Sequence, residues 1–189
     1  MRKSKQETAE TRQRIVEAAS TEFRRNGIDA TGLADLMAAA GLTHGGFYKH
    51  FESKEQVFGE SLALAIDSMV ESMERTASRG KRGLDTVIKD YLSHEFRDNV
   101  ESGCPLVALG SDLARSSDEV REITTAGFLK MVSVIAGRLD DLPPDAARNN
   151  ALVMLSTMIG AVTMARIVSD PALSKAILQQ ARKHLTQRV

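Results

Sequence analysis

Apolar positions recur at intervals of three and four along most of this chain, with Gly, Pro and Asn at the breaks between runs. That interval is typical of helices that bury one face and leave the other in water. The pattern therefore predicts an all-α fold of about nine helices. The first helix ends at residue 26, and the others cover residues 33–40, 44–51, 54–79, 84–97, 106–114, 118–139, 145–168 and 172–187.

Residues 31–51 organise the amino-terminal part of the pattern as two short helices joined by a tight turn. Leu33, Leu36 and Met37 keep helical spacing on one face of the first helix. Gly41 follows where a helix commonly ends in a left-handed residue. We therefore expect Gly41 to make the turn.

The second short helix is expected to bury Phe47 and Phe51, with Thr43 as its amino-terminal cap. A helix-turn-helix places the start of its second helix in the DNA major groove, whereas an ordinary αα-hairpin only has a polar outer face. Spacing alone leaves both interpretations open. The remaining side chains of this helix include no acid and are Thr43, His44, Gly45, Gly46, Tyr48, Lys49 and His50.

Capping patterns flank this unit. Residues 4–7 and 53–56 each have Ser followed three positions later by Glu or Gln, which is the capping-box pattern. Between them, Ile15, Ala19 and Phe23 form the buried stripe of the first helix. The long helix 54–79 is followed by a basic, glycine-containing break at residues 80–83. Lys54 lies in the first turn of this helix and indicates either an anion-binding site or a solvated lysine.

The run 39–58 resembles the recognition-helix signature of the TetR family of bacterial transcriptional regulators, and residues 15–27 resemble the first helix of that family. This resemblance implies an amino-terminal three-helix helix-turn-helix DNA-binding domain, residues 1–52, joined to a helical effector-binding and dimerisation domain, residues 53–189. Gly32 replaces a usual hydroxyl residue and His44 replaces a usual Lys or Arg.

The resemblance also implies roles for individual residues. Residues 43–46 would face base edges, because small residues such as Gly45 and Gly46 let the backbone approach the duplex. The other predicted contacts are to phosphate, from Thr31, Tyr48, Lys49, His50 and Lys54.

Charge neither supports nor excludes a nucleic-acid partner. The whole chain carries 25 basic and 25 acidic residues, so any field that attracts DNA must be local. No stretch of about 18 uninterrupted apolar residues indicates a membrane span, and no signal peptide is recognised. We expect a cytoplasmic protein with no membrane partner, no cofactor and no metal.

Cys104 is the single cysteine, and Pro105 after it suits the first position of a helix. A thiol at the cap of that helix is expected to have a lowered pKa. The segment from Gly103 resembles a TetR branch with Gly-Cys at the start of the sixth helix, some of whose members sense electrophiles or oxidants. Packing, pocket lining and sensing all remain open for Cys104.

The helix at 145–168 is apolar around most of its circumference, and Asp170 with Pro171 is expected to cap the last helix. Such a helix either fills a monomeric core or packs one side on its own subunit and the other on a symmetry mate. We expect a homodimer through the last two helices. Flexible methionines suit an effector pocket or plain core packing, and the candidates are Met131, Met154 and Met158.

The sequence leaves three functions to weigh. The first, which the resemblance implies, is a homodimeric DNA-binding repressor that binds a palindromic operator in double-stranded DNA and is released by a small-molecule or electrophile effector. The second is a helical carrier without DNA binding. The third is an enzyme with a Cys104 nucleophile, for which His94 is the nearest candidate base in sequence.

Overall fold

The computed structural model describes residues 5–79 and 81–187, and all secondary structure in these ranges is helical. The elements number ten α-helices and one 3-10 helix, η1. They are α1 (Lys5–Asn26), α2 (Leu33–Ala39), η1 (His44–Lys49), α3 (Lys54–Ala77), α4 (Lys81–Tyr91), α5 (His94–Asp98), α6 (Pro105–Ala108), α7 (Gly110–Ala114), α8 (Asp118–Ala136), α9 (Pro144–Ile167) and α10 (Pro171–Thr186).

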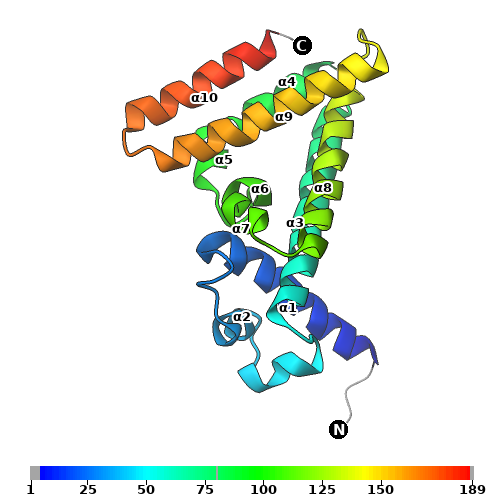
Figure 1. The fold of residues 1–189 in the computed structure, drawn as a ribbon, viewed down its shortest axis with the longest axis vertical. Helices are drawn as coiled ribbons and strands as arrows, with labels where there is room; N and C mark the ends of the chain where they lie inside the picture. The colour runs from blue at the N-terminus through cyan, green and yellow to red at the C-terminus, as the bar shows by residue number, and fades with distance from the viewer. Residues whose placement is uncertain (1–4, 80, 188–189) are drawn as a thin grey trace.

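The helices form two parts joined lengthwise (Figure 1). α1, α2 and η1 make the lower part, and α3 rises from it to run beside α8. α9 and α10 pack against each other across the opposite end of the molecule. α3 therefore packs on both parts.

The amino-terminal core follows the predicted stripe. Ile15, Ala19 and Phe23 of α1 are each at most 1% exposed. Phe23 meets Phe58 of α3 edge to face, with ring centroids 5.1 Å apart, an arrangement that aromatic pairs favour. Burial of this stripe therefore fastens α1 to α3.

Two glycines end helices in the left-handed region that favours glycine. Gly27 has φ 81° and closes α1 through a hydrogen bond from its N–H to the carbonyl oxygen of Phe23 at 2.8 Å. Gly41 has φ 70° and makes the turn after α2. The prediction for Gly41 is thus confirmed.

The predicted break at 80–83 is wrong in part, because α4 already begins at Lys81. A Cβ atom on Gly83 would lie 2.6 Å from the carbonyl oxygen of Thr76, so this glycine permits close packing of α4 on the end of α3. Gly83 therefore serves packing, and the break is shorter than the sequence indicated.

Two predicted helices are each divided in the structure. The segment 84–97 is split because Ser93 caps α5, its Oγ accepting a hydrogen bond from the N–H of Phe96 at 3.0 Å. The segment 106–114 is split at Leu109, where φ is −117°. These divisions raise the number of helical elements in the described ranges from the expected nine or so to eleven.

Gly127 explains how closely α8 packs on α3. A Cβ atom at this position would lie 2.4 Å from Cγ2 of Ile66, so any larger side chain would push the helices apart. The sequence pattern did not single out this residue. Ser117 caps α8, its hydroxyl accepting from the N–H of Val120 at 3.5 Å.

α9 packs only part of its apolar circumference into the chain's own core. Leu155, Met158 and Val162 are fully buried, whereas Val153 and Met164 are 55% and 48% exposed. α9 is long and apolar enough to cross a membrane by length and composition alone, a test that core helices also pass. One apolar face of α9 thus remains uncovered in a single protomer.

Candidate nucleic-acid interface

The second helix of the helix-turn-helix is the 3-10 helix η1, with Thr43 as its N-cap residue. The Thr43 side chain makes no capping hydrogen bond, which leaves its hydroxyl open to solvent. A Cβ atom on Gly45 would meet nothing within 4 Å, so the backbone there is also accessible. The predicted residues that are exposed on this surface are Thr43, His44, Gly45, Tyr48 and Lys49, while Gly46, His50 and Lys54 are half-buried.

The buried rings of Phe47 and Phe51 pack beneath this surface. Phe47 is 0% exposed, and its ring stacks on that of Phe51 with centroids 5.6 Å apart. Tyr48 meets Phe47 edge to face at 5.2 Å but is itself 68% exposed. Tyr48 is therefore packed against the buried Phe47 ring while most of its own side chain is exposed to solvent.

Thr31 lies elsewhere than the DNA-facing surface for which it was predicted. Its side chain is 1% exposed, and its hydroxyl donates to the carbonyl oxygen of Gly27 at 2.7 Å. A hydroxyl committed in this way stabilises the turn after α1 and does not reach a phosphate. We therefore exclude Thr31 from the interface.

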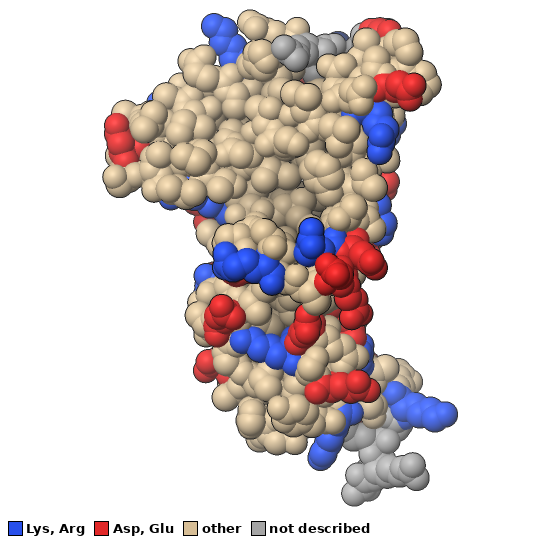
Figure 2. All heavy atoms as spheres, in the orientation of Figure 1, with Lys and Arg blue, Asp and Glu red and all other residues tan. Residues whose placement is uncertain are grey.

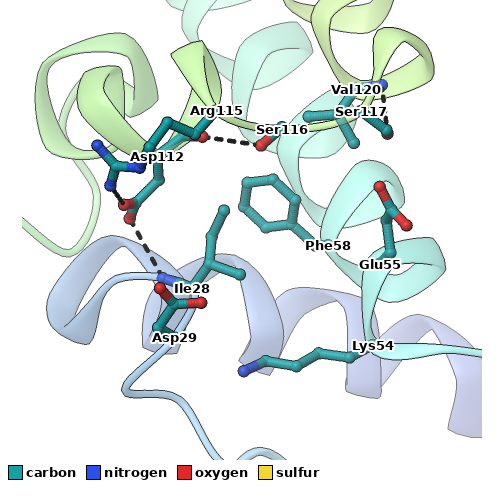
Figure 3. A pocket seen from close by; sticks show the side chains of 10 residues that line it. All are labelled: Ile28, Asp29, Lys54, Glu55, Phe58, Asp112, Arg115, Ser116, Ser117 and Val120. Carbon is teal, nitrogen blue, oxygen red and sulfur yellow. Dashed lines mark hydrogen bonds and ion pairs between the residues drawn. The ribbon is translucent and has the colours of Figure 1, made fainter.

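Lys54 begins α3 and points toward the segment that follows α1 (Figure 3). It lines a cavity of about 370 Å³ between the two parts of the molecule, together with Ile28, Asp29 and Phe58. The Lys54 ammonium has neither a hydrogen bond nor an ion pair within the described residues. Its charge is thus available to an anion near the start of α3.

The start of α3 is fixed by the predicted capping pattern. The Ser53 hydroxyl accepts from the N–H of Gln56 at 3.0 Å, which confirms the cap. The Gln56 side chain reaches back one residue further than the usual capping box, since its Oε1 accepts from the N–H of Glu52 at 2.8 Å. For the box at 4–7, residue 4 lies outside the described residues.

A second connection between the two parts runs from the end of α1 to α7. The N–H of Ile28 donates to Oδ2 of Asp112 at 3.3 Å, and Asp112 also accepts from Arg115 (Figure 3). Arg24 donates to the carbonyl oxygen of Gly103 at 3.2 Å. These partners lie far apart in sequence, so no local pattern indicated them.

Cys104 is the N-cap residue of α6 and Pro105 is its first residue, as predicted. The predicted lowering of the thiol pKa is wrong. Cys104 is 0% exposed, and this burial raises the pKa of its thiol more than the Tyr91 hydroxyl and the amides of α6 lower it. Burial of Cys104 therefore disfavours the thiolate. The helix that it caps, α6, spans only four residues.

The three predicted methionines all lie in the core. Met131 of α8 and Met154 and Met158 of α9 are at most 3% exposed, and α8 packs directly on α9. An effector that touched them would have to open this packed core.

Charged side chains are distributed unevenly over the surface. Figure 2 shows Lys, Arg, Asp and Glu gathered around the junction of the two parts, whereas the centre of the surface over α9 and α10 carries none in this view. The centre of that surface is therefore formed by residues other than Lys, Arg, Asp and Glu.

Two family models match the chain. The model for bacterial regulatory proteins of the tetR family matches residues 15–60, which include α2, η1 and the start of α3. The model for the carboxy-terminal domain of LmrA/YxaF-like transcriptional regulators matches residues 82–184. The second match alone covers more than half of the chain, and the two matches fit the two parts of the fold.

Individual relatives agree with this result. The HTH-type transcriptional repressor BepR of Brucella suis is 36% identical over 172 residues, which cover 85% of this chain and 82% of BepR. The crystal structure of a TetR regulator from Chloroflexus aurantiacus superposes with a TM-score of 0.80 and 26% identity, covering 96% of this chain and 95% of that one. E. coli NemR in its reduced form has the same fold, with a TM-score of 0.79, 19% identity and coverage of 94% and 96%.

The chain therefore belongs to the TetR family, and it is a DNA-binding transcriptional regulator. The family is one of regulators and not of enzymes, so the Cys104-nucleophile hypothesis is set aside. A carrier without DNA binding is likewise not favoured, since the helix-turn-helix itself matches the family.

Proposed function

We propose that this protein is a homodimeric repressor that binds a palindromic operator through η1 of each protomer. The observation that carries the proposal is the surface of η1, which is exposed, polar and without an acid, and which is supported by the buried ring of Phe47. Repression follows where the operator overlaps a promoter. Residues 1–52 would form the DNA-binding domain and residues 53–189 the regulatory domain, in the cytoplasm.

The individual contacts follow from exposure and chemistry. Thr43, His44, Gly45 and Gly46 would meet base edges in the major groove, because a helix-turn-helix presents the start of its second helix there. Phosphates would be bound by side chains that donate hydrogen bonds without reading sequence. These are Tyr48, Lys49, His50 and Lys54.

The dimer would form through α9 and α10. Val153, Met164 and Ile167 are exposed apolar side chains on α9, and Gly160 among them has open space where a Cβ atom would stand. A small residue in an apolar face lets another helix approach closely. An isologous contact of this face with its copy would cover it completely.

Regulation would be a shift between two conformational populations. In one, the spacing of the two recognition helices fits the operator, and in the other it does not. An effector that binds the second population better releases the DNA. Candidate contacts are the core residues Cys104, Met131, Met154 and Met158, which an effector would reach only by opening the packed core. α3 would carry the change, since it packs on both α1 and α8.

Tyr48→Phe is expected to weaken binding about tenfold on every DNA sequence, since it removes one hydrogen bond to a charged phosphate. The dependence on salt should not change, because no cation is lost. His44→Ala should instead change which sequences are preferred. Gel-shift titrations of both variants on several duplexes measure this, and unaltered affinity of Tyr48→Phe at every salt concentration would withdraw the phosphate role.

Cys104 is expected to react with iodoacetamide at least about tenfold more slowly than free cysteine at neutral pH. The reason is that its thiol is buried and its pKa is raised, so little thiolate is present. Mass spectrometry of timed samples gives the rate, with the urea-unfolded protein as control. A native rate equal to the unfolded rate would favour the sensor role over packing.

A further inference from the structure

Arg12 joins three elements near the proposed DNA-binding surface. Its Nη2 donates to Oε1 of Glu60 in α3 at 2.5 Å, and its Nε donates to the carbonyl oxygen of His50 at 3.4 Å. Its guanidinium carbon lies 4.5 Å from the centre of the Phe51 ring. One side chain of α1 therefore contacts both the two residues that follow η1 and the second turn of α3.

The partner carboxylate extends this contact across the turn between η1 and α3. Glu60 also accepts from Nε2 of Gln56 at 3.3 Å. Gln56 in turn accepts from the N–H of Glu52 and donates its own N–H to Ser53. The hydrogen bonds thus run without interruption from α1 to the backbone of the turn, and Arg12 is the member that comes from outside it.

We propose that Arg12 is a positioning residue that sets the orientation of η1 relative to α3, without itself contacting DNA. The proposal rests on η1 being the DNA-binding element. Arginine suits the role because its flat guanidinium stacks on a ring and offers several donors in fixed directions. Its side chain is 37% exposed, and its charge is already paired with Glu60.

Glu60 separates this role from a phosphate contact. If Arg12 bound phosphate, Glu60 would compete with the DNA, and Glu60→Gln would strengthen binding. If Arg12 holds η1 in place, Glu60→Gln removes a support and weakens binding. The two roles therefore predict changes of opposite sign for the same substitution.

The experiment compares Arg12→Met, Arg12→Lys and Glu60→Gln on a duplex of about 30 base pairs, long enough for two half-sites, selected from a random pool by the unmodified protein. Arg12→Met should lower the DNA affinity about tenfold, Glu60→Gln about threefold, and Arg12→Lys by less than Arg12→Met. The double variant with Arg12→Met and Glu60→Gln should bind no more weakly than Arg12→Met alone, because both substitutions break the same contact. Arg14→Met and Glu17→Gln, on the exposed side of α1, are matched controls without this effect.

The slope of log affinity against log salt is the decisive readout. This slope should stay the same in Arg12→Met, whereas loss of a phosphate contact would make it shallower by about 0.9 per protomer. Hydrogen exchange of residues 46–51 in the DNA-free protein should accelerate in Arg12→Met and not in Arg14→Met. If Arg12 only stabilised the fold, Arg12→Met would lower the unfolding temperature and leave the DNA affinity of the folded protein unchanged.

Each failure has its own pattern. If the unmodified protein selects no duplex, the proposed function falls and the positioning role falls with it. If it binds tightly and Glu60→Gln strengthens binding, or the salt slope falls in Arg12→Met, only the positioning role is overturned. The same holds if Arg12→Met matches Arg14→Met in both affinity and exchange.

Discussion

Replacement of Phe47 by alanine is expected to lower the free energy of unfolding by about 3–5 kcal/mol and to abolish operator binding. The ring is 0% exposed and stacks on Phe51, so its removal leaves a cavity directly beneath η1. A loss of this size is a large share of the 5–15 kcal/mol or so that stabilises a typical domain. Chemical denaturation and operator titration of the same preparation measure both effects.

Phe47→Leu is the matched control, because it keeps most of the volume and should cost less than about 1.5 kcal/mol. It should still bind the operator. An alanine variant that unfolds at the denaturant concentration of the unmodified protein, with unchanged DNA affinity, would contradict the role of Phe47 as the support of η1.

Met164→Glu is expected to convert the protein into a folded monomer. Met164 is 48% exposed in a single protomer, so the charge costs little there. In the proposed dimer the carboxylate would be buried without a partner at about 3 kcal/mol or more in each protomer. The dimer dissociation constant should therefore rise a thousandfold or more, about 1.4 kcal/mol corresponding to each tenfold step. Sedimentation equilibrium gives the constant.

Leu129→Glu provides the control for this substitution. Leu129 is an exposed apolar residue of α8, 38% accessible, and it lies outside the proposed dimer surface. It should leave the dimer and operator affinity intact. A Met164→Glu protein that remains dimeric at micromolar concentration would require a different interface from α9 and α10.

Short-range chemistry made several features predictable from the sequence. Gly41 takes the left-handed conformation, and the Ser53 hydroxyl caps α3. Asp170 likewise caps α10, its carboxylate accepting from the N–H of Ala172 at 2.8 Å with Pro171 between them. In each case the interacting groups are within a few residues of one another, so the pattern contains the whole interaction.

The divided helices were missed because the apolar spacing continues across each break. Tyr91 and Phe96 lie on opposite sides of the interruption at Ser93, and their rings nevertheless stack with centroids 4.4 Å apart. Because the apolar residues keep helical spacing across Ser93, the sequence pattern looks like that of a single helix. Ser93 itself is an N-cap residue type, which is the local signal that could have indicated the break.

Residue roles that depend on distant partners were not predictable. Arg12 meets Glu60, and Ile28 meets Asp112, only after the helices have packed. Thr31 shows the reverse error, since it was expected to face DNA and is instead buried, and the burial of Cys104 likewise comes from the packing of distant elements. Burial is set by the whole fold, and it reversed the expected pKa shift of Cys104.

The central claim is that two copies of η1 bind a palindrome, and a DNA titration tests it most directly. Purified protein would be titrated onto the DNA upstream of its own gene and onto a scrambled duplex of equal length, at several salt concentrations. The account predicts two protomers per palindrome and a log affinity that falls linearly with log salt on the upstream DNA. Equal affinity for the upstream duplex and its scrambled version at every salt concentration would contradict it.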